Sequence, residues 1–82
     1  MARVRLRFFA AARDAAGCTT TELDAATVED ALSQARAAFG DDFSAVLERA
    51  RVWVNGDEPV DGERSSLSEG DEVAVIPPVS GG

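Results

Sequence analysis

Two glycines close the sequence, and they are the residues through which this chain could do chemistry. Gly81 and Gly82 follow a strand-like run and the prolines Pro77 and Pro78, in the stretch IPPVSGG. Because glycine has no Cβ, a segment tipped with glycine can enter a channel too narrow for any side chain and can carry a terminal carboxylate into the active site of another protein. Frayed termini also tolerate glycine, so this interpretation depends on what precedes the pair.

The residues before the two glycines favour a segment that projects from the body of the protein. The paired prolines fix their own φ angles and bias the residue before each of them toward extended geometry, and Val79 and Ser80 continue the segment. Six extended residues span roughly 20 Å. We therefore expect residues 1–76 to form one folded domain and residues 77–82 to form a flexible tail that ends in Gly-Gly.

A carboxylate at the tip of such a tail needs activation before it can react. Its oxygen is a poor leaving group, but an ATP-using partner that joins the carboxylate to AMP creates a mixed anhydride, which a sulfur nucleophile can displace. In this interpretation Gly82 carries the reacting carboxylate and Gly81 keeps the tip narrow. The chain is then the reagent rather than the catalyst. We expect no cofactor on the chain itself, since ATP is used by the partner.

The amino-acid composition excludes most other chemistries. The 82 residues include no histidine, no lysine and a single cysteine, Cys18, so neither a Ser-His or Cys-His nucleophile pair nor a zinc or iron–sulfur site can be built, and we expect no metal. The net charge of −7 disfavours nucleic acid and favours a partner with a basic face. No apolar run approaches the roughly 18 residues of a membrane span, and one cysteine fits a reducing compartment. We therefore expect a soluble, cytoplasmic protein without a membrane partner.

Alternating hydropathy predicts the strands of an α+β domain. A period of two in residues 3–8 and 51–54 is typical of half-buried strands. The β-branched run 18–23 and the apolar run 72–76 add two more strands. An Asn-Gly pair follows the third strand and predicts a tight turn, after which residues 58–60 should return as a short edge strand. We expect a mixed sheet of about five strands.

One main helix should pack across this sheet. Thr27 can cap a helix whose apolar residues recur at helical spacing through residues 28–39, until Gly40 ends the run. Residues 41–50 repeat the pattern on a smaller scale, with an acidic start that suits the helix dipole, and predict a short second helix. Residues 10–17 favour only a short helical turn.

The last strand is expected to lie between the first and the third, so that the tail starts from the centre of the sheet. The valines of the third and last strands should then face the main helix; they are Val52, Val54, Val73 and Val75. Alternation places Trp53, Ala74 and Ile76 on the opposite face, near the base of the tail. A contiguous apolar patch at that point is better explained as a partner-docking surface than as isolated exposed residues.

The chain resembles the MoaD/ThiS family of sulfur carriers, which have the ubiquitin-like β-grasp fold. The resemblance covers essentially the whole chain. VRLRFFAAARDAAG resembles the opening strand and turn of the MoaD branch, VWVNG its third strand, and LSEGDEVAVIPPVSGG its last strand and tail. The last of these motifs is the specific one, because a glycine pair alone is common.

This resemblance implies the small subunit of molybdopterin synthase, active in molybdenum cofactor biosynthesis. An adenylyltransferase of the ubiquitin-activating type would adenylate Gly82, and a sulfur donor protein would convert it to a thiocarboxylate. The tail would then enter the large subunit, in a heterotetramer, and donate sulfur to a cyclic pyranopterin. MoaD-type carriers often have two aromatic residues where Val75 and Ile76 stand here. The alternatives are a carrier for thiamine or cysteine biosynthesis, and a ubiquitin-like modifier or interaction module without sulfur chemistry.

Overall fold

The computed structural model describes residues 1–78 of the chain, and residues 79–82 are not described. The four strands are β1 (Ala2–Phe8), β2 (Thr20–Ala25), β3 (Arg51–Val54) and β4 (Glu72–Ile76). The helices are α1 (Ala10–Ala16), α2 (Val28–Phe39) and α3 (Asp41–Arg49), followed by a short 3₁₀ helix, η1 (Gly62–Arg64). None of the helices within residues 1–78 is long and apolar enough to cross a membrane.

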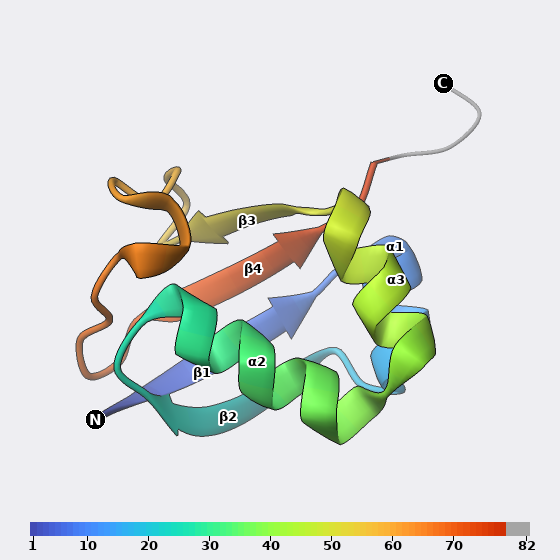
Figure 1. Cartoon of the computed structure of the whole chain (residues 1–82), viewed down its shortest axis with the longest axis horizontal. Helices are drawn as coiled ribbons and strands as arrows, with labels where there is room; N and C mark the ends of the chain where they lie inside the picture. The colour runs from blue at the N-terminus through green and yellow to red at the C-terminus, as the bar shows by residue number, and fades with distance from the viewer. Residues whose placement is uncertain (79–82) are drawn as a thin grey trace.

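The strands form one mixed sheet in the order β2-β1-β4-β3 (Figure 1). The last strand, β4, runs parallel to β1 and antiparallel to β3, while β1 and β2 are antiparallel. The expected position of the last strand between the first and the third is therefore confirmed. So is the α+β, ubiquitin-like β-grasp architecture, in which the main helix crosses one face of the sheet.

Within residues 1–78 the sheet has four strands, because the expected edge strand at residues 58–60 does not form. After the tight turn, Asp57 makes an isolated bridge to Val54, with N–H···O=C distances of 2.8 and 3.0 Å in the two directions. Pro59 comes two residues later and has no N–H to extend that pairing, and the side chain of Val60 is 95% exposed. The chain then bends into η1 instead of returning along β3.

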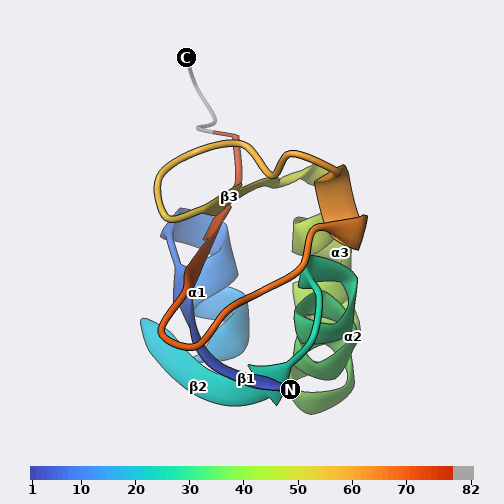
Figure 2. The same ribbon diagram turned by 90° about the vertical axis from the view of Figure 1, so that its left-hand side faces the viewer.

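The hydrophobic core lies between one face of the sheet and the helices (Figure 2). The strands contribute Val4, Leu6 and Phe8 from β1 and Val73 and Val75 from β4, each at most 3% exposed. The main helix α2 contributes Val28, Ala31, Leu32 and Ala35. Three aromatic rings close one end of the core, those of Phe8, Phe39 and Phe43, with centroids 5.2–5.4 Å apart. Such edge-to-face and tilted packing adds to the stabilisation from burial.

Local signals place the helix ends. The Thr27 hydroxyl accepts a hydrogen bond from the Asp30 N–H at 3.1 Å, and this cap starts α2 as predicted. Gly40, at φ 89°, ends α2 and precedes α3. The predicted helical turn at residues 10–17 is instead a seven-residue helix, closed by Gly17 at φ 77°. After the chain reversal at Gly17 the second strand begins at Thr20, two residues later than predicted, so Cys18 precedes β2 rather than lying within it.

Candidate functional site

The sheet holds the residues from which the predicted tail starts. Strand β4 is bonded to β1 on one side and to β3 on the other, and the Phe9 N–H donates to the Val75 carbonyl at 3.2 Å where β4 ends. Pro77 is buried and Pro78 is exposed, so the chain leaves the body between these two residues. The remaining predicted tail residues are not among those that the structure describes; they are Val79, Ser80, Gly81 and Gly82.

The predicted docking residues lie together on the face of the sheet opposite the helices. Trp53 is directly opposite Ala74 in the pairing of β3 with β4, and Ile76 is the next outward residue along β4. Trp53 and Ile76 are therefore diagonal neighbours, with Cα atoms roughly 7–8 Å apart. The side chains of Trp53 and Ala74 are half-buried, and that of Ile76 is 36% exposed. The structure therefore brings together all three residues that alternation had selected.

A fourth residue, Phe9, belongs with them and was not predicted. It follows β1 in extended geometry, at φ −119° and ψ 149°, and its side chain is 37% exposed. Because Phe8 is opposite Val75, Phe9 comes level with Ile76. Two adjacent aromatic residues in an extended segment must point to opposite faces, and this was the available signal. We call Phe9, Trp53, Ala74 and Ile76 the outer patch.

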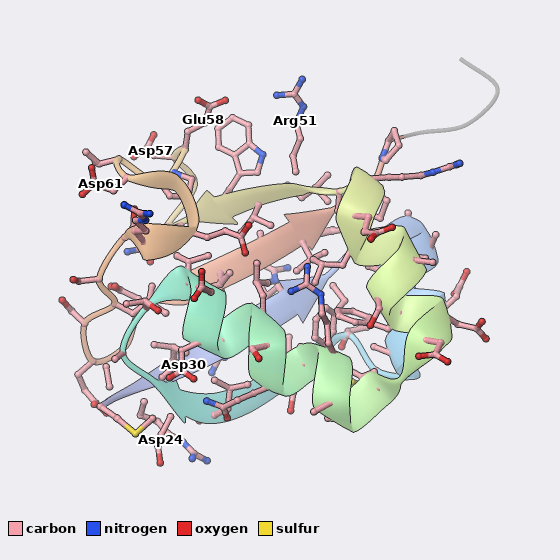
Figure 3. The ribbon with its side chains drawn as sticks, viewed as in Figure 1. Asp24, Asp30, Arg51, Asp57, Glu58 and Asp61 are labelled. Atoms are coloured by element: carbon pink, nitrogen blue, oxygen red, sulfur yellow. The ribbon has the colours of Figure 1, made fainter. Side chains whose placement is uncertain are left out.

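Two arginines border the outer patch. The Arg7 guanidinium carbon lies 5.2 Å from the centroid of the Phe9 ring, and one of its nitrogens is 3.5 Å from a Glu72 carboxylate oxygen. Arg51 is opposite Ile76 and lies 3.9 Å from Glu58, with which it points away from the body (Figure 3). The Arg51–Glu58 pair is largely exposed and the Arg7–Glu72 pair is partly exposed, so each contributes little to stability and can exchange for other contacts.

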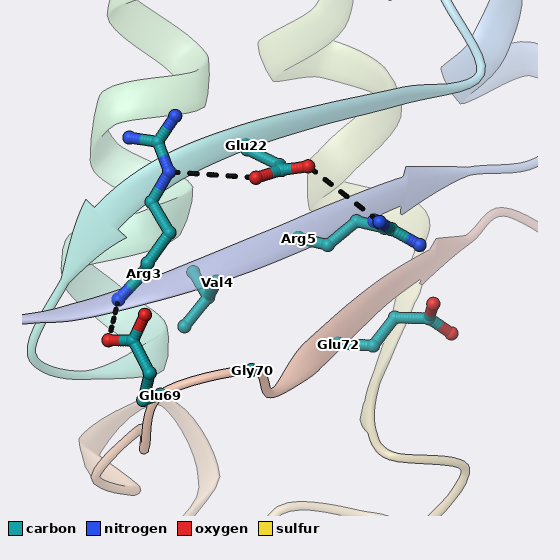
Figure 4. Close-up of a pocket in the computed structure, with 7 residues that line it drawn as sticks. All are labelled: Arg3, Val4, Arg5, Glu22, Glu69, Gly70 and Glu72. Carbon is teal, nitrogen blue, oxygen red and sulfur yellow. Dashed lines mark hydrogen bonds and ion pairs between the residues drawn. The ribbon is translucent and has the colours of Figure 1, made fainter.

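The rest of this face is covered by paired charges. Glu22 lies 3.6 Å from Arg3 and 3.7 Å from Arg5, and the Arg3 backbone N–H donates to Glu69 at 2.9 Å (Figure 4). These residues, with Glu72 and others, line a shallow hollow of about 340 Å³. Arg3 and Arg5 pair with Glu22 there, and Glu72 pairs with Arg7, whereas among the described residues the Glu69 carboxylate accepts only the backbone N–H of Arg3. No group of acidic, histidine or cysteine side chains within residues 1–78 is arranged to hold a metal ion.

A polar brace fixes β3 against the start of β4. The Asn55 side-chain N–H donates to Asp71 at 3.0 Å, and the Asn55 side-chain oxygen accepts from the Glu72 N–H at 2.9 Å. Asp71 also accepts the Ser68 N–H at 2.7 Å. The bond from Ser68, and then the bond from Asn55, hold the pKa of the Asp71 carboxyl below its ordinary value of 3.8. The brace therefore depends on an ionised carboxylate.

This brace predicts a specific pH dependence of stability. A carboxyl whose pKa is lower in the folded chain contributes stability above its unfolded pKa, and this contribution is lost as the pH falls through the folded pKa. We expect Asp71→Asn to lower the free energy of unfolding by no more than about 1 kcal/mol at neutral pH, because the group lies near the surface. The difference from the parent should shrink in acid, below about pH 4. Urea titrations across this range, with Asp57→Asn as the control, would measure it, and a difference independent of pH would contradict it.

The fold defines a ubiquitin-like domain, and the outer patch lies on the outward face of its sheet beside the end of β4. The chain belongs to the ThiS family, whose sequence profile matches residues 6–82. It is 37% identical over 81 residues to a molybdopterin synthase sulfur carrier subunit of Escherichia coli, covering 96% of this chain and 99% of that protein. A protein of the same description from Chlamydomonas reinhardtii is 36% identical over 83 residues, covering 98% of this chain and 99% of that protein.

Solved structures agree on the fold. Small archaeal modifier protein 1 from Haloferax volcanii superposes with a TM-score of 0.85 at 31% identity, covering 98% of this chain and 99% of the other. The protein of the same name from Methanosarcina acetivorans superposes with a TM-score of 0.87 at 27% identity, covering 100% and 98%. Subunits 1 and 2 of molybdopterin-converting factor from Helicobacter pylori form a complex, a chain of which matches with a TM-score of 0.73 at 20% identity, covering 98% and 99%.

Proposed function

We propose that this chain is a sulfur carrier and that it serves as the small subunit of molybdopterin synthase in molybdenum cofactor biosynthesis. The observation that carries the proposal is the outer patch. It consists of the outward residues at the end of β4 and of Phe9 and Trp53 on either side of them, next to the start of the predicted tail. The family membership and the names of the curated relatives support the same assignment. Thiamine and cysteine biosynthesis remain alternative destinations for the sulfur.

The proposed chemistry takes place at Gly82. An adenylyltransferase of the ubiquitin-activating type joins the carboxylate to AMP, and pyrophosphate leaves ATP. Hydrosulfide supplied by a sulfur donor protein then attacks the acyl carbon, AMP leaves, and a thiocarboxylate remains. In the synthase, the tail enters the large subunit and transfers this sulfur to a cyclic pyranopterin. Two such transfers supply the two sulfurs of a dithiolene. The chain itself binds no cofactor in this scheme.

The body contributes to this chemistry by positioning the tail. A strand bonded on both sides has little freedom, and the burial of Pro77 carries that order one residue past β4. When the start of the tail is already ordered, less conformational entropy is lost on binding of the tail to a partner. The same contacts then give a higher affinity. The outer patch would then dock on the large subunit and align the tail with its pocket.

The partner surface suited to the outer patch is apolar at its centre. Trp53 and Phe9 offer aromatic area, and aromatic residues dominate the energetics of protein interfaces. Arg7 and Arg51 sit at the border of the patch, where they can pair with acidic groups of the partner. In this way the docking face suits a partner with acidic spots around an apolar centre, although the chain as a whole carries a net charge of −7.

The direct test is mass spectrometry of the intact chain after incubation with a ubiquitin-activating-type adenylyltransferase, ATP and a sulfide source. We expect the mass gain that corresponds to one oxygen replaced by one sulfur, confined to the peptide that contains Gly82. The same mixture without ATP is the control. A chain that keeps its original mass in the presence of an enzyme that modifies a known carrier would contradict the proposal.

Protein modification is the second candidate function. It is favoured by the match to two structures named small archaeal modifier protein 1, one of them at 31% identity. In that role the activated Gly82 would form an amide bond with a lysine of another protein, and no sulfur would be transferred to a pterin. A series of higher-mass conjugates in the native host would support modification, whereas a thiocarboxylate without conjugates would support the carrier.

The substitution Gly81→Ala tests whether the tip of the tail must be narrow. If the tail enters a tight channel, one added methyl group should reduce the rate of thiocarboxylate formation or sulfur transfer by about fivefold or more, since a steric conflict in a packed site costs roughly 1–3 kcal/mol. Single-turnover assays with the purified activating enzyme and the large subunit would measure both steps. Ser80→Ala is the matched control. Equal rates for Gly81→Ala and the parent would show that the glycine is not needed for its small size.

A further inference from the structure

The tight turn after β3 contains the chain's only asparagine, Asn55, followed directly by Gly56. Both residues have positive φ, 52° and 86°, as a two-residue turn of type I′ requires. A glycine leaves the approach to the preceding side chain open, because it has no Cβ. The backbone nitrogen of Gly56 can therefore reach the amide carbon of Asn55 whenever that side chain is free to rotate.

In the folded chain the Asn55 side chain is tied at both ends. Its nitrogen donates to Asp71 at 3.0 Å, and its oxygen accepts from the Glu72 N–H at 2.9 Å. The backbone N–H of Asn55 also donates to the Glu72 carbonyl at 2.8 Å. Attack by Gly56 would require the side chain to break both of its bonds, one of which is to a carboxylate and so is of the stronger kind.

We propose that Asn55 is a hydrolytic modification site that Asp71 and Glu72 keep unreactive. When the brace opens, the Gly56 nitrogen loses its proton and bonds to the amide carbon of Asn55, and the side-chain nitrogen leaves as ammonia. Solvent water then opens the resulting succinimide ring, to give aspartate or isoaspartate at position 55. The net reaction consumes one water and releases one ammonia, with no oxidant or cofactor.

The product would destabilise the brace that had protected Asn55. A carboxylate at position 55 cannot donate to Asp71 and would repel it at hydrogen-bonding distance. Among residues 1–78, strand β3 is a four-residue edge strand paired with β4 alone, and this brace adds to the ladder hydrogen bonds that hold its end. Trp53 lies two residues before Asn55. Modification should therefore loosen β3 and expose Trp53, which is the chain's only tryptophan.

The test compares rates of deamidation at mildly alkaline pH, below the unfolding temperature. Intact mass follows the gain of about one dalton, and peptide mapping separates Asn55 from Gln34, the chain's only other side-chain amide. We expect Asp71→Ala to react about tenfold faster than the parent, because a hydrogen bond to a charged group has been removed. The free peptide RVWVNGDE should react faster still. Asp57→Ala, in the same turn, should react at the parent rate.

Faster deamidation caused by loss of the brace must be distinguished from faster deamidation caused by lower global stability. Val46→Ala on α3 removes part of a half-buried side chain that does not belong to the brace, and it should lower the thermal midpoint without accelerating deamidation. Asn55→Asp, as a mimic of the product, should shift Trp53 emission to longer wavelength. The proposal is overturned if the parent reacts as fast as the peptide, if Asp71→Ala matches the parent, if Val46→Ala matches Asp71→Ala, or if Asn55→Asp leaves the emission unchanged.

Discussion

Deletion of Gly82 is expected to abolish thiocarboxylate formation while leaving the thermal midpoint unchanged. The carboxylate that would be adenylated then belongs to Gly81, one residue short of the activating site, and each extended residue accounts for about 3.3–3.6 Å of reach. The fold should not respond, because the buried side chains among the described residues all lie between Ala2 and Pro77. Mass spectrometry after reaction with the activating enzyme, together with thermal unfolding, would measure both properties.

The control for this deletion is Ser80→Ala, which changes the tail but keeps its length and its final carboxylate. It should be converted at close to the parent rate. A chain without Gly82 that still became a thiocarboxylate, or that still supported cofactor synthesis in a host lacking the parent, would contradict the carrier function. A chain without Gly82 that unfolded at a lower temperature would instead show that the tail contributes to the fold.

Trp53→Ala and Ile76→Asp are each expected to weaken the complex with the synthase large subunit at least about tenfold. Truncation of a central interface tryptophan commonly costs 2 kcal/mol or more, and tenfold corresponds to about 1.4 kcal/mol. Ile76→Asp places a charge among apolar groups, where it would lose hydration on binding. Isothermal titration calorimetry would give the dissociation constants, and circular dichroism would establish that both variants remain folded.

The matched control is Val60→Asp, the same kind of replacement on a side chain that is 95% exposed and lies outside the outer patch. It should bind as the parent does. Normal binding by both patch variants would place the docking surface elsewhere on the protein. Trp53 emission typical of a fully buried indole in the free chain would argue against its half-buried position at the centre of the patch.

Most of the fold could be predicted because its main elements are amphipathic. The burial of β1 alternates at every residue, so period two identified both the strand and its core face. The main helix had a capping residue, Thr27, and a terminating glycine, Gly40, and both act as predicted. The outward placement of Ala74 and Ile76 followed from the same alternation, because Val73 and Val75 are fully buried and the residues between and after them must point outward.

What could not be predicted depended on competition between weak local preferences. The sequence of residues 58–60 favoured a strand, but Pro59 lacks the N–H that a strand pairing would use, and the segment forms a loop. A hydropathy pattern does not include the free-energy cost of one missing backbone hydrogen bond. The helix α1 is only seven residues long, and its stability comes from tertiary contacts with α3 and β1. The local sequence does not reveal these contacts. Phe9 was missed because strand alternation was followed only to the predicted end of β1.

The parallel pairing of β1 with β4 joins the two ends of the chain, since Arg5 pairs with Glu72 and Phe8 with Val75. One edge of β1 therefore stays unpaired until β4, the segment that leads into the predicted tail, has been synthesised and has paired with it. Pairing across so long a separation forms late and favours all-or-none folding. A chain interrupted before β4 would leave that edge of β1 unpaired and would lack Val73 and Val75, which are fully buried in the complete fold. The outer patch can therefore form only after β4 has taken its place in the sheet. An incomplete chain does not present this surface to a partner.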